Sequence, residues 1–83
     1  MSTILIIEDD EQQRVILKKV LEIAGYTVLA AADGTSGIEM ARSSAPDLIL
    51  CDIDMPGLSG FQTLKALKDD ERTKDLPFVF LTG

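Results

Sequence analysis

The residues of this chain that could carry chemistry are carboxylates gathered at two places. Residues 8–11 are all acidic and directly follow a short apolar run, and Asp52 and Asp54 follow another apolar run. The sequence contains no histidine, which removes the commonest general base and metal ligand. Any chemistry must therefore rest on carboxylates, hydroxyls and the backbone.

Carboxylates brought together repel one another, and each raises the pKa of its neighbours unless something compensates. A hard divalent cation compensates naturally, because Mg²⁺ binds carboxylate oxygens, carbonyl oxygens and water. A carboxylate beside Mg²⁺ can also attack phosphorus and form an aspartyl phosphate. The Thr82 hydroxyl could donate a hydrogen bond to a phosphoryl oxygen, although alone it would be interpreted as a strand-end residue without a role. The alternative is that these acids are simply solvated loop residues. Two acidic clusters at the same edge of one sheet make that alternative less favoured.

Short apolar runs alternate with helical patterns and would position these groups. Strands are predicted at residues 3–7, 27–31, 48–51 and 77–81. The first helix between them is predicted to end at Gly25, and the second to be capped by Thr35 or Ser36 and to run to about Ser43. The third is predicted to pack into the core through the stripe of Phe61, Leu64 and Leu67. This β-α-β-α-β-α-β order predicts right-handed crossovers and an α/β parallel sheet with helices on both faces. Sites in such sheets form beyond the carboxyl ends of the strands, so the acids converge if the first, third and fourth strands are neighbours.

Composition restricts the classes of function. The chain has 83 residues, which allows one small domain with a modest core. Its 14 acidic and 8 basic residues give a net charge of −6, so it lacks the basic footprint of a direct nucleic-acid binder. The apolar run near the N-terminus is too short for a signal or membrane helix. The single cysteine, Cys51, suits a reducing cytoplasm and is interpreted as a buried strand residue.

Four sequence runs together resemble the receiver domain of two-component response regulators. They are ILIIEDD at 4–10, PDLILCD at 46–52, DMPGLSG at 54–60 and FLTG at 80–83. Each is weak alone, but their order makes a specific match that covers the whole chain. The resemblance implies a flavodoxin-like, doubly wound sheet of strand order 2-1-3-4 that lacks the last strand and two helices. Residues 1–83 would then be the N-terminal two thirds of a receiver domain.

The resemblance also implies a role for each site residue. Asp52 would be the phosphoacceptor, and Thr82 would be the switch hydroxyl that moves toward the phosphoryl group. Glu8 and Asp9 would be the acidic pair that holds Mg²⁺ or Mn²⁺, with Asp9 the more direct ligand and Glu8 acting largely through water. Asp54 would contribute its backbone carbonyl to the metal.

A histidine kinase or phosphotransfer protein is the implied partner, and the basic face of the first helix, with Arg14, Lys18 and Lys19, is either its docking region or simply solvated. The family's phosphoryl-binding lysine follows a fifth strand, and Lys65 and Lys68 of the third predicted helix are not assumed to replace it. The fourth strand would form an exposed sheet edge. We therefore expect self-association through that edge or by exchange of elements, with a dimer first.

Two other functions stay open at this stage. Asp52-Ile53-Asp54 is an Asp-x-Asp motif, as in phosphatases of the haloacid-dehalogenase type, where the second Asp is a general acid and base. That reading is disfavoured because the motif follows the third strand and an acidic pair follows the first. The other alternative is a truncated receiver without catalysis that acts as an assembly module.

Overall fold

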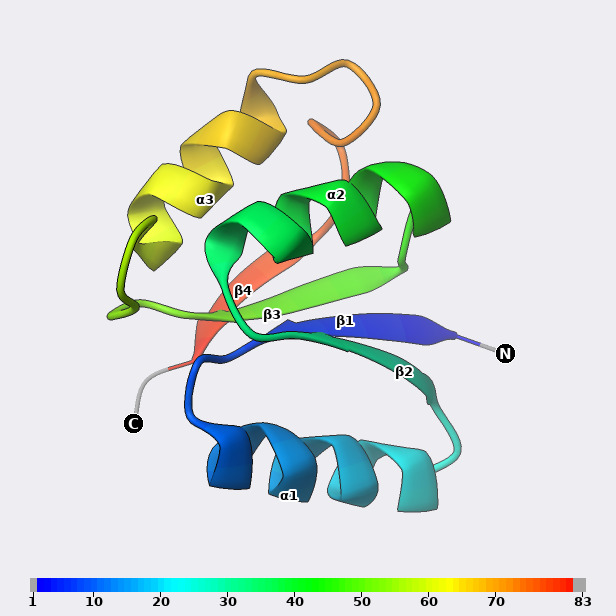
Figure 1. Cartoon of the computed structure of the whole chain (residues 1–83). Helices are drawn as coiled ribbons and strands as arrows, with labels where there is room; N and C mark the ends of the chain where they lie inside the picture. The colour runs from blue at the N-terminus through cyan, green and yellow to red at the C-terminus, as the bar shows by residue number, and fades with distance from the viewer. Residues whose placement is uncertain (1, 82–83) are drawn as a thin grey trace.

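Four short strands form one parallel sheet in the order β2-β1-β3-β4 in the computed structural model, which describes residues 2–81 (Figure 1). The elements along the chain are β1 (Thr3–Ile7), α1 (Glu11–Ile23), β2 (Thr27–Ala31), α2 (Gly34–Ser44), β3 (Leu48–Asp52), α3 (Gly60–Lys68) and β4 (Phe78–Leu81). Element order and strand order confirm the predicted flavodoxin-like arrangement with four strands and three helices. No helix described between residues 2 and 81 is both long and apolar enough to cross a membrane.

The central strand β1 is enclosed on both faces. It pairs in parallel with β2 on one side and with β3 on the other, where Leu5 lies opposite Ile49. Leu5, Ile6 and Ile7 have no exposed surface. A strand covered by neighbours and by helices on both faces must be apolar throughout, which explains the unbroken run that predicted it.

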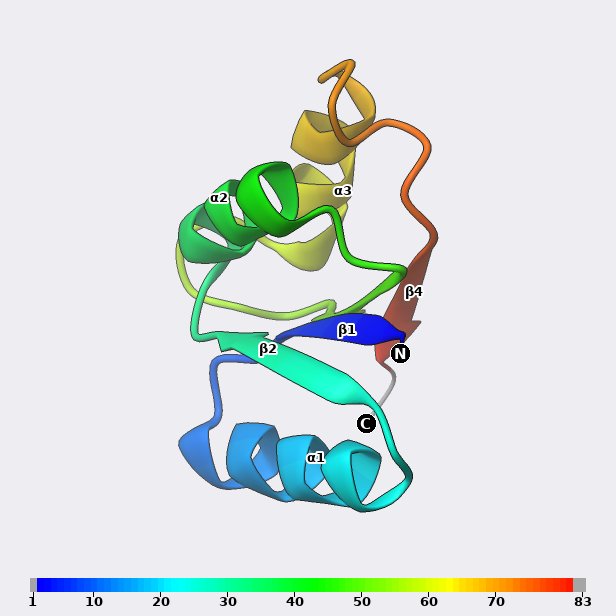
Figure 2. The same cartoon turned by 90° about the vertical axis from the view of Figure 1, so that its right-hand side faces the viewer.

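The two helical layers cover the sheet unequally (Figure 2). On one face α2 and α3 pack over the sheet, with Ile38 and Leu67 joining a core that includes Leu5 and Ile49. On the other face α1 packs against β2 and β1, and Leu17 contacts the smaller core. The β3–β4 half of that second face is therefore less covered.

Two helix starts differ from the sequence-based expectation. α2 is capped by Asp33, whose carboxylate accepts a hydrogen bond from the Ser36 amide at 2.8 Å, so the predicted cap at Thr35 or Ser36 is wrong. Asp and Ser cap helices equally well, and the sequence pattern could not rank them. α3 begins at Gly60, one residue earlier than its apolar pattern begins, because Ser59 and Gln62 form a capping box.

Phe61 is also placed differently from the expectation. It is 60% exposed on α3, whereas the spacing of Phe61, Leu64 and Leu67 predicted a core stripe. Its ring lies 5.0 Å from that of Phe80, and Phe80 lies 5.2 Å from Phe78. The aromatic contacts therefore run along the edge of the sheet, and Leu67 alone of that stripe is fully buried.

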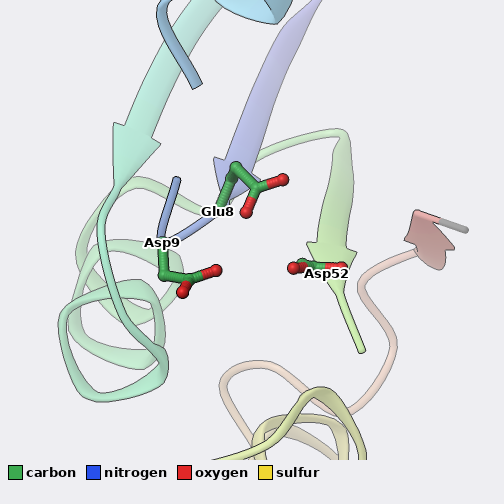
Figure 3. A group of neighbouring side chains, drawn as sticks. All are labelled: Glu8, Asp9 and Asp52. Atoms are coloured by element: carbon green, nitrogen blue, oxygen red, sulfur yellow. The ribbon is translucent and has the colours of Figure 1, made fainter. Parts of the chain in front are cut away.

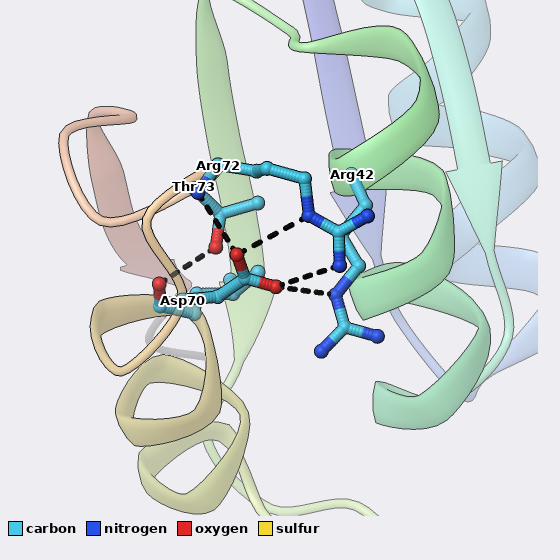
Figure 4. A network of polar contacts seen from close by, with 5 residues as sticks. Arg42, Asp70, Arg72 and Thr73 are labelled. Atoms are coloured by element: carbon cyan, nitrogen blue, oxygen red, sulfur yellow. Dashed lines mark hydrogen bonds and ion pairs between the residues drawn. The ribbon is translucent and has the colours of Figure 1, made fainter.

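A polar network holds the non-helical segment between α3 and β4 (Figure 4). Asp70 accepts from Arg42 of α2 at 2.7 Å and from Arg72 at 3.2 Å. Hydrogen bonds from Arg72, and then from Arg42, hold the pKa of Asp70 well below its usual range. The buried Thr73 hydroxyl donates to the Leu67 carbonyl at 2.6 Å. These contacts fix the path by which the chain returns to β4.

Gly60 is the point where α3 meets the end of β3. Its amide donates to the Ile53 carbonyl at 2.7 Å, and an added Cβ would lie 2.9 Å from Ile53 Cα and closer still to the Asp52 carbonyl oxygen. A backbone atom cannot rotate away as a side-chain end can. A side chain at this position therefore requires the backbone to shift.

We predict that Gly60→Ala lowers the free energy of unfolding by about 1–3 kcal/mol, as overpacking does elsewhere. Urea unfolding followed by circular dichroism measures the change. Lys65→Ala is the control on the same helix, because it removes only an exposed ion pair worth about 0.3–0.5 kcal/mol. Equal stability of Gly60→Ala and the unmodified protein would show that the α3–β3 junction is looser than described.

Candidate functional site

Three carboxylates meet at the carboxyl ends of two neighbouring strands. Glu8 and Asp9 follow β1, and Asp52 is the last residue of β3. Each offers an oxygen, and these oxygens all lie within 4.8 Å of one another (Figure 3). The sequence predicted this convergence, and the β1–β3 pairing produces it.

Glu8 is the buried member of the three. It is 4% exposed, and its carboxylate accepts a hydrogen bond from the Asp10 amide at 3.2 Å. Burial raises the pKa of Glu8 above its usual value of 4.5, and the negative charge of Asp52 raises that pKa further, while the Asp10 amide opposes the shift. Negative charge at this position is therefore destabilised in the folded protein.

Asp52 is half-buried, and the backbone of the residue that follows it orients its carboxylate. Its Oδ1 accepts from the Ile53 amide at 2.9 Å. Behind it Cys51 is fully buried, and burial, with the charges of Asp52 and Glu8, raises the pKa of the Cys51 thiol to about 12. The thiol stays protonated at neutral pH, which confirms Cys51 as a core residue and not a reactive one.

The roles of two other predicted site residues stay predictions. Asp54 is exposed, and its side chain does not belong to the group of three carboxylates. The role predicted for it uses its backbone carbonyl, and that role stays a prediction. Thr82 lies outside the described residues, so its function as a switch hydroxyl also stays a prediction.

The contact of Arg14 with the acidic loop after β1 was not predicted from the sequence. Its Nη1 donates to the Glu8 carbonyl at 2.9 Å and approaches the Asp9 carbonyl at 3.4 Å. Sequence spacing placed Arg14 with Lys18 and Lys19 on a basic helix face. Its position in the first turn of α1, directly after an acidic loop, was the only available signal.

An apolar groove opens beside the carboxylates. It has a volume of about 330 Å³ and is lined by Glu8 and Asp52 at one end, by Leu81 of β4, and by α1 residues that include Ile16 and Val20. Ile16 is 63% exposed and Val20 is 56% exposed. The groove lies over the half of the sheet face that α1 leaves less covered.

The donor set fits a hard divalent cation. All three groups are carboxylates, which suit Mg²⁺ or Mn²⁺ and not the softer metals that prefer nitrogen or sulfur. The pKa of Glu8 is raised first by burial and then by the negative charge of Asp52, and a bound cation would stabilise the charged form of Glu8 against both effects.

Sequence comparison finds one family for this chain. The profile of the response regulator receiver domain matches residues 4–83. Protein PilH of Pseudomonas aeruginosa is 40% identical over 82 residues, which are 99% of this chain and 68% of PilH. The polar-differentiation response regulator DivK of Brucella abortus is 35% identical over 81 residues, which are 98% of this chain and 66% of DivK. The chain thus spans about two thirds of the length of these relatives.

Solved structures agree with this. The N-terminal domain of a response regulator receiver protein from Methanoculleus marisnigri superposes with a TM-score of 0.95 at 34% identity, over 99% of this chain and 67% of that one. The receiver domain of sensor histidine kinase PA1611 from Pseudomonas aeruginosa superposes with a TM-score of 0.92 at 28% identity, over 98% of this chain and 66% of that one. That structure carries a magnesium ion coordinated in its active site cleft.

We predict that Glu8→Gln raises the melting temperature at pH 7 in EDTA by a few degrees. A carboxyl whose pKa is raised on folding binds more protons in the folded state, so stability falls as pH rises from 4.5 through the folded pKa. Glutamine removes that loss and keeps an oxygen for the Asp10 amide. Differential scanning calorimetry at pH 4 and pH 7 measures the effect, which should shrink at pH 4.

Glu39→Gln on the exposed side of α2 is the matched control, since it makes the same charge change away from the carboxylates. An equal gain in Glu39→Gln would assign the effect to net charge and contradict a local cause.

Proposed function

Because the chain belongs to the family of response regulator receiver domains, we propose that it is a phosphoacceptor switch of a two-component phosphorelay, phosphorylated on Asp52. The observation that carries this proposal is the position of Asp52. It ends β3 with its carboxylate within 4.8 Å of the carboxylates of Glu8 and Asp9. A nucleophile and a set of cation ligands therefore share one sheet edge.

The proposed reaction is transfer of a phosphoryl group from phosphohistidine. An oxygen of Asp52 forms a bond to phosphorus, the phosphorus–nitrogen bond breaks, and its electron pair stays on the departing imidazole. The Ile53 amide, hydrogen-bonded to Oδ1, orients the attacking carboxylate. The Thr82 hydroxyl would donate a hydrogen bond to a phosphoryl oxygen of the product.

A divalent cation would supply the positive charge that neutralises the phosphoryl oxygens during transfer. Asp9 and Asp52 would hold Mg²⁺ or Mn²⁺ directly, the Asp54 carbonyl would be a third protein ligand, and Glu8 would act through water. The backbone amide of Glu8 donates to the Ala31 carbonyl at 3.1 Å, and its buried carboxylate accepts from the Asp10 amide at 3.2 Å.

The partner in this proposal is a histidine kinase or phosphotransfer protein. The apolar groove beside Asp52, which Ile16 and Val20 of α1 line, offers a surface next to the acceptor. Such a surface suits a helical partner that presents a phosphohistidine.

The phosphatase alternative has less support. The Asp54 side chain is exposed and is not one of the three carboxylates that come together, which does not favour a role as general acid. Steady turnover of p-nitrophenyl phosphate would favour that alternative over a switch.

We predict that acetyl phosphate with Mg²⁺ adds one phosphoryl group to the protein, on Asp52, and that Asp52→Asn abolishes the labelling. Intact mass spectrometry and peptide mapping after borohydride trapping locate the adduct. Asp47→Asn is the matched control, because Asp47 is an exposed aspartate five residues away that caps the amide of Thr3 at 2.7 Å. Undiminished labelling of Asp52→Asn, or label on another residue, would overturn the assignment.

A second proposal, that the chain also self-associates, rests on its exposed apolar surface. β4 pairs only with β3 among the described strands and so ends the sheet. Val79 on β4 is 51% exposed, and Ile16 and Val20 face the adjoining groove. An unpaired edge beside exposed apolar side chains can pair with a second copy.

We predict a dimer at micromolar concentration in sedimentation equilibrium, and a monomer for Val79→Lys, because an added charge on an edge strand opposes pairing. Glu39→Gln on α2 makes the same change in net charge and should leave the dimer intact. A stable monomer of the unmodified protein with cooperative unfolding would refute self-association.

A further inference from the structure

We infer that Arg14 is a positioning residue that fixes the acidic pair after β1 for cation binding. The inference rests on the proposed function. Arg14 lies in the first turn of α1, and its guanidinium turns back to the end of β1 instead of pointing into solvent. Its Nη1 donates to the Glu8 carbonyl at 2.9 Å and approaches the Asp9 carbonyl at 3.4 Å. One side chain thus contacts two successive peptide groups of the loop that carries the carboxylates.

The contacts matter because of how the two acids are held. Glu8 is 4% exposed, and both packing and a backbone hydrogen bond to Ala31 restrain it. Asp9 is exposed, so its carboxylate gains little from packing. The backbone of an exposed residue largely sets the direction of its side chain, and Arg14 contacts the carbonyls of the two peptide groups that flank Asp9. Asp9 therefore depends on Arg14 more than Glu8 does.

Arg14 also connects the loop to the helix that follows it. The Asp10 side chain caps α1 by accepting from the Gln13 amide at 3.2 Å, and the Arg14 amide donates to the Asp10 carbonyl at 2.9 Å. The guanidinium adds a third connection, which reaches past Asp10 to the two residues before it. Outer contacts of this kind set ligand orientation in metal sites, and their loss typically weakens metal binding about 10–100-fold.

Charge and positioning predict opposite results when Arg14 is removed. A cation near the carboxylates is repelled by the guanidinium, so loss of charge alone would tighten cation binding. Loss of positioning would weaken it, because Asp9 would no longer be held beside Asp52. The sign of the change therefore separates the two roles.

We expect Arg14→Met to weaken Mn²⁺ binding about tenfold, the low end of the range for such outer contacts. Mn²⁺ alone is the probe, and free ion is measured by electron paramagnetic resonance well below the melting temperature. Arg14→Lys, which keeps one charged donor, should recover part of the affinity. Lys19→Met is the matched control, because it removes a charge from the exposed side of the same helix, and its affinity should stay within about twofold of the unmodified protein.

Melting of each variant in EDTA shows that the comparison is between folded proteins. If Arg14→Met is unfolded at the assay temperature, Arg14→Gln takes its place and keeps a polar group at this half-buried position. Unchanged or tighter Mn²⁺ binding by the folded neutral variant would overturn the inference. Absence of Mn²⁺ binding by the unmodified protein, together with absence of labelling on Asp52, would instead overturn the proposed function.

Discussion

The repulsion among three carboxylates at one sheet edge is the constraint around which this molecule is organised. Glu8, Asp9 and Asp52 come within 4.8 Å of one another because β1 and β3 are paired neighbours that end side by side. Burial of Glu8 adds a desolvation cost to that repulsion, and its pKa rises accordingly. Such an arrangement lowers the stability of the free protein, because charged side chains are more stable when they point into solvent. Arrangements of this kind are typical of binding sites. Electrostatic repulsion of this kind indicates a site where a bound cation or an added phosphoryl group changes the local charge.

The scaffold around the carboxylates is stiff where it must hold them. β1 is enclosed by two strands and two helical layers, so the backbone that leads to Glu8 has no freedom to move outward. Gly37 of α2 lies against the side chain of Ile7, and Gly60 lies against the backbone that follows Asp52. Both glycines allow a helix to approach the sheet at the residue next to an acid. Close packing at these two places restrains the backbone next to the site.

The opposite sheet face is incomplete among the described residues, and this changes what the site can contact. α1 lies against β2 and β1, and the space beside it over β3 and β4 is an apolar groove that begins at Glu8 and Asp52. The same groove thus joins the acidic site to the surface through which we propose that two copies associate.

Sequence alone determined the features that depend on local pattern. Apolar runs predicted all four strands because strands buried on both faces need them, and the acids after the runs predicted which residues meet. Glu8, Asp9 and Asp52 were among those acids, and the four family motifs singled them out and supplied the strand order that brings them together. The Asp33 cap shows the limit of this local reasoning, since several adjacent residues could have capped α2.

Tertiary structure decided the features that depend on distant partners. Phe61 is exposed and its ring contacts that of Phe80 on the edge strand β4, a contact that helical periodicity does not encode. From the sequence, Arg14 is expected to be a solvated basic residue. In the structure its guanidinium contacts two carbonyls of the loop before α1. The ion pair between Arg42 and Asp70 likewise joins residues 28 positions apart. The pattern of residue types along the chain indicates which side chains are able to form hydrogen bonds or ion pairs. Only the folded backbone determines which of them come within reach of one another.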